Sequence, residues 1–313
     1  MTSQPNRFLT ESVKDQLAWA FVAICPLFFS SNMLIARGMS GIFPPISMAF
    51  SRWFFVGILV IGSLIILRRF EWRTVLREYR QILFLASLGM GLCGGPVYLA
   101  GELTTATNIG LIYSAAPLLI ALLAFVGFRE TLTKRQGLGL ALGLIGVVMI
   151  LSQAEMARLF DLRFNTGDLW IVLATISFSV YSLGLKYLKT GLSQIQRFGV
   201  MALGGALWHV PFMMREIVIR GPWPDLSAQI FGALFVLIFF ASIGAYLTYG
   251  YIVSRLGATI AGTTLYLSPV YAAILAVIFL DETIMDYHVI GGALILPGLL
   301  LVSQKRKPMK GAH

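Results

Sequence analysis

The chain has 313 residues, of which 58% are apolar and only 12% are charged, and its mean hydropathy is +0.82. A soluble domain of this length with so few charges would aggregate, so the composition predicts a membrane protein in contact with the lipid bilayer. A net charge of +10 would suggest nucleic-acid binding in a soluble chain. Here the basic residues lie between apolar runs, the pattern of a membrane protein, so we expect no nucleic-acid partner.

The two cysteines, Cys25 and Cys93, both lie inside apolar segments, which predicts neither a disulfide framework nor a metal site. Residues 1–16 are polar and mixed in charge. The apolar run that follows is longer than a signal-peptide core and has no small-residue cleavage pattern. We therefore expect an uncleaved first transmembrane helix.

Windows of about 20 apolar residues predict ten transmembrane helices. Their expected ranges are 17–37, 44–67, 82–102, 109–128, 134–152, 168–188, 196–215, 227–254, 258–280 and 287–304. The eighth is long enough to tilt or to project beyond the hydrocarbon layer.

Lysine and arginine are distributed unevenly between alternate connections, and this predicts the orientation of the chain. One side of the membrane would hold 18 of them, including Arg68, Arg73, Lys134 and Lys305, and the opposite side only five. Arg52 lies inside the second expected helix. Both termini are therefore expected in the cytoplasm.

A stretch of 41 residues, Ala106 to Gly146, occurs a second time as Ala258 to Gly298, 152 positions later and without a gap. The two copies share 14 identical positions, including the pairs Pro117/Pro269 and Glu130/Glu282. Each copy reads as an apolar run, a short polar hairpin and a glycine-rich apolar run. The repeating unit is thus a long helical hairpin.

Five helices in each half is an odd number, so the second half must enter the membrane from the other side. The sequence therefore predicts an all-α fold of ten transmembrane helices in two inverted five-helix repeats around a central cavity. Such halves are characteristic of secondary transporters, because they can rock about a central site. The expected organisation is a cytoplasmic segment 1–16, a first repeat 17–152, a periplasmic linker 153–167, a second repeat 168–304 and a basic tail 305–313.

The repeated pattern Ala-Thr-x-x-Gly, proline, Glu-Thr and a glycine-rich run resembles the paired EamA repeats of the drug/metabolite transporter superfamily. The resemblance covers nearly the whole chain, and it is closest to the ten-span bacterial exporters, including the YddG-like amino-acid exporters. It implies export of amino acids and related metabolites across the bacterial inner membrane and no bound cofactor. It also implies a cavity built from helices 1, 3, 4, 6, 8 and 9.

Three repeated features have candidate roles. Pro117 and Pro269 lie near the middle of the fourth and ninth helices, where each frees a backbone carbonyl. We expect each proline to form a kink that gates or shapes the cavity; the alternative is a kink that serves packing alone.

Glu130 and Glu282 precede the fifth and tenth helices and are expected to have a structural role at the hairpin. Thr133 and Gln136 are expected to form a capping box beside the first of them. The small residues expected to pack these two helices together within one molecule, rather than between molecules of an oligomer, are Gly139, Gly143, Gly291 and Gly292.

Polar and aromatic residues at membrane depth are the candidates for lining a substrate cavity. Thr175, Ser179 and Ser182 share one face of the sixth helix. Exposing this row of hydroxyl groups to lipid would cost free energy, so we expect the face to be turned away from lipid. The alternative is that each hydroxyl bonds its own helix and each tyrosine belongs to an interfacial belt. The full set is Ser31, Asn32, Tyr98, Tyr113, Ser114, Ser179, Ser182, Ser242, Tyr246, Tyr249, Thr263 and Tyr266.

Few charged residues lie at depth, and this narrows the substrate class. Arg52, Lys186, Glu102 and His209 are the candidates. A nucleotide-sugar carrier would need several converging cations, so a neutral or zwitterionic substrate fits better. Arg52 could instead pair with backbone carbonyls, and Lys186 could reach the cytoplasmic edge.

Together with what the family resemblance implies, the expected function is a monomeric secondary exporter of aromatic or other neutral amino acids and related small metabolites, with no cofactor, working by alternating access. The alternatives are a broad drug and metabolite exporter, a nucleotide-sugar carrier, and an intramembrane enzyme. No catalytic motif is visible for the enzyme.

Overall fold

The computed structural model describes residues 11–155, 157, 165–225, 227–280 and 284–303, and the regular elements of those residues are all helical. The elements are α1 (Glu11–Gly38), α2 (Pro45–Ile66), α3 (Trp72–Arg77), α4 (Tyr79–Ala86), η1 (Ser87–Leu92), α5 (Gly95–Leu103), α6 (Ala106–Tyr113), α7 (Ala116–Phe128), α8 (Lys134–Leu151), α10 (Thr166–Tyr187), α11 (Gln194–Arg220), α12 (Ala228–Ile238), η2 (Phe239–Gly244), α13 (Ala245–Leu256), α14 (Ala258–Thr263), η3 (Thr264–Leu267), α15 (Ser268–Leu280) and α16 (Asp286–Ser303).

Nine stretches of the described residues are helical, long and apolar enough to cross a membrane, which confirms the predicted all-helical class. They are Glu11–Ala36, Pro45–Ile66, Tyr79–Leu103, Asn108–Phe128, Lys134–Leu151, Thr166–Tyr187, Ala228–Leu256, Ala258–Leu275 and Asp286–Ser303. The remaining expected span, 196–215, falls in α11, which has 27 residues but is more polar. Its polar residues include Arg197, His209 and Glu216, and these three are buried inside the protein. A tenth span therefore stays a prediction.

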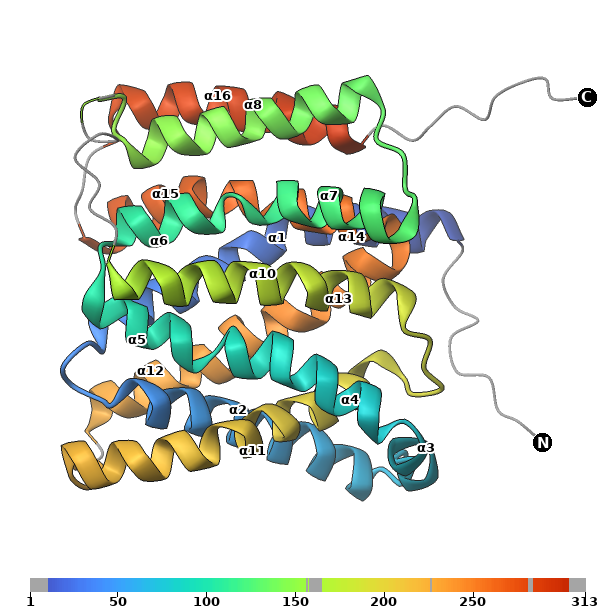
Figure 1. The fold of residues 1–313 in the computed structure, drawn as a ribbon, viewed down its shortest axis with the longest axis vertical. Helices are drawn as coiled ribbons and strands as arrows, with labels where there is room; N and C mark the ends of the chain where they lie inside the picture. Colours follow the sequence, from blue (N-terminus) through green and yellow to red (C-terminus); the bar gives the residue numbers. More distant parts are fainter. Residues whose placement is uncertain (1–10, 156, 158–164, 226, 281–283, 304–313) are drawn as a thin grey trace, which may run out of the picture.

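The long helices run side by side in successive layers (Figure 1). α8 and α16 form one edge, α2 and α11 the opposite edge, and α1, α5, α10 and α13 lie between them. The connections between α2 and α3, α7 and α8, α10 and α11, and α13 and α14 lie at one end of the bundle, where α1 also begins.

Several helices begin at side chains that satisfy their unpaired backbone N–H groups. The Thr133 hydroxyl accepts from the Gln136 N–H while the Gln136 side chain accepts from the Thr133 N–H, so the predicted capping box is confirmed. Asn165 and Asp168 form the same box at the start of α10. These caps fix where the helices enter the bundle.

The edge pair α8 and α16 approach closely because glycines face each other. A Cβ atom on Gly139 would lie 2.5 Å from the Gly298 carbonyl oxygen, and one on Gly146 would lie 2.6 Å from that of Gly291. A Cβ atom on Gly143 would meet the ring of Tyr266. A Cβ on Gly292 would meet nothing within 4 Å, so Gly292 does not belong to this contact. A Cβ on Gly298 would lie 2.9 Å from the Gly143 backbone nitrogen, so the α8–α16 contact depends on Gly139, Gly143, Gly146, Gly291 and Gly298.

Two wide helical turns interrupt the long helices that contain α5 and α13. The segments η1 and η2 are π-helical and six residues long, and they begin at Ser87 and Phe239, 152 positions apart. That is the offset which aligns the repeated sequence. A π-helical turn alters the backbone hydrogen bonding, so its carbonyls become acceptors for side chains from other helices. The Gly89 carbonyl accepts from the Tyr246 hydroxyl at 2.9 Å, and the Ala241 carbonyl accepts from Arg52 at 2.6 Å.

Candidate functional site

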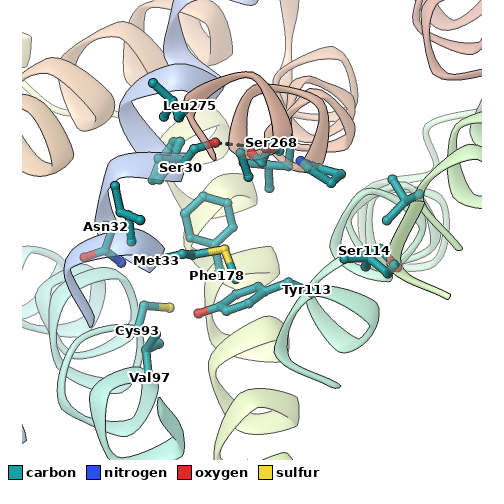
Figure 2. A pocket seen from close by; sticks show the side chains of 18 of the residues that line it. Ser30, Asn32, Met33, Cys93, Val97, Tyr113, Ser114, Phe178, Ser268 and Leu275 are labelled. Carbon is teal, nitrogen blue, oxygen red and sulfur yellow. Dashed lines mark hydrogen bonds between the residues drawn. The ribbon is translucent and has the colours of Figure 1, made fainter. Parts of the chain in front are cut away.

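A cavity of about 300 Å³ is lined by residues of α1, α5, α6, α8, α10, α13 and α15, and Figure 2 shows it from close by. This volume is at the lower end of the range for small-molecule sites, about 300–1,000 Å³. In Figure 2 the Tyr113 ring of α6 points toward Met33 of α1 and Cys93 beside α5. The described residues that line the cavity are Phe29, Ser30, Asn32, Met33, Leu34, Arg52, Cys93, Val97, Gly110, Tyr113, Ser114, Val147, Leu151, Phe178, Tyr246, Leu265, Ser268, Pro269, Ala272 and Leu275.

Four of the twelve residues predicted to line a cavity are on its wall: Asn32, Tyr113, Ser114 and Tyr246. Tyr98 and Ser242 lie directly behind it, where both bond Arg52. These six residues come from α1, α5, α6, α13, η2 and the junction between α6 and α7.

The other six predicted residues lie outside the cavity lining. Ser31, Ser179 and Thr263 each donate a hydrogen bond to a carbonyl of their own helix, at 2.7–2.8 Å. Ser182 also bonds its own helix, and its hydroxyl lies 2.7 Å from that of Tyr249. Tyr266 packs on Gly143 of α8. The polar face of α10 is therefore buried against protein, with its hydroxyls satisfied locally.

Both prolines of the repeat lie at interruptions of a long helix. α6 ends at Tyr113 and α7 begins at Ala116, one residue before Pro117. Because proline has no N–H, the Tyr113 carbonyl cannot form the usual bond to position 117. In the second half, η3 and Ser268 precede Pro269, which lines the cavity. The prolines thus mark the places where the helices next to the cavity depart from regular geometry.

The sequence did not predict the contact of Ser30, which joins α1 to α15 at the cavity wall. The Ser30 hydroxyl lies 2.8 Å from the Pro26 carbonyl of its own helix and 3.0 Å from the Ser268 carbonyl of α15. The second bond is drawn in Figure 2. The available signal was the repeat, because the 152-residue offset aligns Ser30 with Ser182. Phe29 and Phe178 also line the cavity, with their ring centroids 6.0 Å apart. Neither was predicted from the sequence, because the candidates were chosen among polar residues and tyrosines.

Arg52 of α2 is the charged residue among the described lining residues of the cavity. Its side chain is surrounded by neutral acceptors. Nε donates to the Ser242 hydroxyl at 2.6 Å, and Nη1 donates to Asn32 Oδ1 at 2.8 Å and to the Tyr98 hydroxyl at 2.9 Å. Nη2 donates to the Ala241 carbonyl at 2.6 Å. The expected pairing with backbone carbonyls accounts for one of these four bonds.

The His209 ring is held between two helices, away from the cavity lining. Its Nε2 accepts from the Gly95 N–H at 2.9 Å, so it carries no proton, and its Nδ1 lies 2.7 Å from the Gly205 carbonyl, to which it donates. The residue is fully buried. Both ring nitrogens are therefore occupied by backbone groups.

The first hairpin makes a contact that the sequence did not predict. The Glu130 carboxylate accepts from Lys186 and from the Tyr187 hydroxyl, both at the end of α10, and the rings of Phe128 and Tyr187 stack with centroids 3.6 Å apart. Glu130 therefore joins two helical units, in addition to any effect on the start of α8. The matching Glu282 lies outside the described residues.

Metal and thiol chemistry has no visible site in the part of the chain that the structure describes. No group of three or more His, Cys, Asp or Glu side chains there is placed to hold an ion. Cys25 and Cys93 are buried free thiols that donate to backbone carbonyls.

Comparison with known proteins identifies the family. The sequence profile of the EamA-like transporter family matches residues 16–152 and, a second time, residues 165–304. YyaM of Bacillus subtilis strain 168, described as an uncharacterized transporter, is 23% identical and aligns over 88% of this chain and 90% of its own length. An uncharacterized transporter of Archaeoglobus fulgidus is 22% identical over 92% of this chain and 99% of its own length.

Two further similarities concern a named exporter and a solved structure. A probable terminal-alkyne amino-acid exporter of Streptantibioticus cattleyicolor is 25% identical over 64% of this chain and 65% of its own length. A crystal structure with 20% identity superposes with a TM-score of 0.70, covering 93% of this chain and 96% of that one, and it shares the fold. Since the two profile matches together cover most of a chain rich in membrane-spanning helices, the protein belongs to the EamA-like transporter family and is a membrane transporter.

Proposed function

We propose that this transporter is a secondary exporter of neutral amino acids and similar small metabolites, and that it moves them out of the cytoplasm across the inner membrane as a monomer. The single observation that carries the proposal is the cavity: a small, largely apolar chamber with hydroxyl groups and one guanidinium on its wall. Such a chamber suits a compact molecule with an apolar body and a polar head group.

Two inverted five-helix halves would supply the alternating access. The repeated family match supports the duplication, and so do the π-helical turns η1 and η2 and the helix interruptions before Pro117 and Pro269, which recur at the same 152-residue offset. Matched irregular helices around a central site are typical of transporters built from inverted repeats. Ten membrane spans, with α11 as the seventh, complete this arrangement.

The basic connections would face the cytoplasm. Arg68, Arg129, Lys134 and Lys189 lie in or beside connections at the same end of the bundle, the pattern of the positive-inside rule. The cavity extends toward the opposite end of the bundle, because its lining includes Leu34 near the end of α1 and Leu151 at the end of α8. We therefore assign the structure to an outward-facing state.

The contact between Glu130, Lys186 and Tyr187 would close the cytoplasmic side in that state. It joins the α7–α8 hairpin to the end of α10 at the basic end of the bundle. Opening toward the cytoplasm would separate these two units. The ion pair is only partly buried, so breaking it costs little, which suits a contact that must form and break in each cycle.

The composition of the cavity also bears on the competing functions. A nucleotide-sugar carrier would need several cations around the phosphates, and Arg52 alone carries charge among the described lining residues. A broad drug exporter would differ from an amino-acid exporter mainly in the wider range of substrates that it transports. The named amino-acid exporter among the relatives supports the narrower substrate class.

An intramembrane serine hydrolase with a histidine base would need a histidine free to activate the serine. Both His209 nitrogens are bonded to backbone groups, of Gly95 and Gly205, so this ring cannot act as the base in the observed arrangement. We propose transport without catalysis.

Counterflow with purified protein in proteoliposomes tests the proposal. Vesicles loaded with unlabelled threonine, methionine or tryptophan should accumulate the labelled amino acid from outside, and protein-free vesicles should not. Accumulation of nucleotide sugars but of none of the three amino acids would contradict it, and so would covalent turnover of an added lipid or peptide.

A further inference from the structure

The charge of Arg52 has no counter-ion among the residues that the structure describes. The side chain is 2% exposed, and within the described residues no Asp or Glu forms an ion pair with it. Burying an unpaired cation is energetically costly, and such residues inside a membrane usually serve a substrate or an ion pathway. The position of Arg52 on the cavity wall therefore requires an explanation beyond packing.

Local interactions hold the guanidinium in place but leave its charge uncompensated. The four acceptors are two hydroxyls, an amide oxygen and a backbone carbonyl, all neutral. The guanidinium carbon also lies 4.4 Å from the centroid of the Trp53 ring and 6.0 Å from that of Tyr246. Such cation–π contacts are weaker than a buried ion pair, so they do not replace a carboxylate. One of the five N–H groups, on Nη2, has no protein acceptor in the described residues.

The π-helical turn η2 explains why this arginine is oriented so firmly. The Ser242 hydroxyl donates to the Leu237 carbonyl five residues earlier, at 2.7 Å, which leaves its lone pair for Arg52 Nε. The adjacent Ala241 carbonyl accepts from Nη2. Tyr98 accepts from Arg52 and donates to Asn32 Oδ1 at 2.7 Å, which closes the network on the other side. A cation positioned before its partner arrives loses little entropy when it binds.

We infer that Arg52 binds the carboxylate of the transported molecule, so that the substrates are monoanionic carboxylates, or zwitterions with a carboxylate, that carry a compact apolar body. This inference rests on the proposed function and adds the substrate feature that is recognised. A carboxylate would supply the missing charge and an acceptor for the unused N–H. The apolar lining, including Phe29, Met33 and Phe178, would surround the body of the substrate.

Equilibrium binding to the purified full-length protein tests the inference separately from transport. The probes are L-tryptophan and L-tryptophanamide, which differ only in the carboxylate. The acid should bind more tightly than the amide by about tenfold to a hundredfold, the range expected for a charge-assisted hydrogen bond. Arg52→Gln should remove this preference, and Arg52→Lys should restore it only in part, because one ammonium cannot reach all of the neutral acceptors.

Asn32→Asp tests the role of Arg52 in a variant that is expected to remain folded. The change is nearly isosteric and keeps an oxygen acceptor 2.8 Å from Nη1, but it adds a built-in counter-ion. We expect it to raise the melting temperature of the protein and to weaken binding of the acid by about tenfold or more, because the new carboxylate occupies Arg52.

The outcomes separate the two proposals. Equal affinity for acid and amide in the natural protein, no binding of either, or unchanged acid binding in Asn32→Asp would overturn the role of Arg52. Selective, Arg52-dependent binding of the acid without counterflow of any amino acid would support that role and contradict amino-acid export.

Discussion

At the scale of single residues, His209 has a structural task. Its two ring nitrogens join the backbone of Gly95, at the start of α5, to that of Gly205 in α11. A proton on Nε2 would remove the acceptor of the Gly95 N–H. The ring is therefore fixed in its neutral form by geometry, and we do not expect it to carry protons through the transport cycle.

His209→Ala should lower thermal stability and leave the energetics of transport unchanged. The substitution leaves the Gly95 N–H buried without an acceptor, at a cost of about 1–3 kcal/mol. Thermal denaturation and the dependence of flux on an imposed pH gradient measure the two effects. His209→Gln, whose side-chain oxygen can accept the same bond, should recover part of the stability. A folded His209→Ala protein that no longer responds to the pH gradient would contradict this assignment.

Side-chain roles were the part of the site that the sequence predicted least well. Helical spacing identified the polar face of α10, but whether that face meets water or protein depends on the helices packed against it. Ser179 and Ser182 turned out to bond their own backbone. Arg52 was recognised as deep, yet its main partners Asn32, Tyr98 and Ser242 lie on three other helical segments, a proximity that only the fold creates.

At the scale of elements, the glycine contact between α8 and α16 leaves no room for a methyl group. A Cβ atom on Gly146 would lie 2.6 Å from the Gly291 carbonyl oxygen and 2.8 Å from Ile295 Cγ1. Neither the backbone oxygen nor the buried Ile295 side chain can move far without separating the helices. This edge of the bundle is therefore sensitive to a small increase in volume.

Gly146→Ala should destabilise the protein by about 1–3 kcal/mol, the usual cost of overpacking a tight contact. Gly292→Ala is the matched control, since the added Cβ meets nothing within 4 Å and alanine favours a helix. Thermal denaturation of both variants in the same detergent measures the difference. Equal melting temperatures would show that the α8–α16 contact is looser than the structure indicates.

The contact at the basic end should govern opening toward the cytoplasm. Glu130→Gln removes the charge that pairs with Lys186, and an ion pair this exposed is worth about 0.2–1 kcal/mol. The labelling rate of a cysteine replacing Thr259, which lines the small pocket beside this pair, should therefore rise by about 1.5-fold to fivefold in inside-out vesicles.

Glu102→Gln provides the control for that measurement. It breaks the ion pair with Arg220, whose nitrogen lies 2.7 Å from the carboxylate, at the other end of the bundle. It should not raise the labelling rate at Thr259→Cys. Equal rates in the natural sequence and in Glu130→Gln would argue against a closing role for this contact.

Helix positions followed from the sequence more closely than side-chain roles. Long apolar runs indicate membrane spans directly, so the range expected as 82–102 became Tyr79–Leu103 and that expected as 227–254 became Ala228–Leu256. The π-helical turns within these two spans were not predicted, because a wider turn is stabilised by donors from other helices, such as Arg52 and Tyr246, rather than by its own sequence. The expected span 196–215 lies within α11, where Arg197 and Glu216 are buried against protein and Arg215 and Arg220 are exposed.

At the scale of the whole molecule, the account depends on two similar halves inserted in opposite directions around one cavity. The proposed arrangement accounts for features 152 positions apart that recur while their surrounding charges differ: Arg129, Lys134 and Arg135 surround the first hairpin, whereas Asp281 and Asp286 occupy the second. Parallel halves would place both hairpins on the same side of the membrane. The sidedness of the two hairpins therefore distinguishes the two architectures.

Cysteine labelling in intact cells measures that sidedness. Both natural cysteines are buried, so the background should be low. A membrane-impermeant maleimide should label Asp286→Cys, at the start of α16, from outside the cell, and should label Lys134→Cys, at the start of α8, only after the membrane is permeabilised. Labelling of both positions from the same side would contradict the inverted halves and the alternating access built on them.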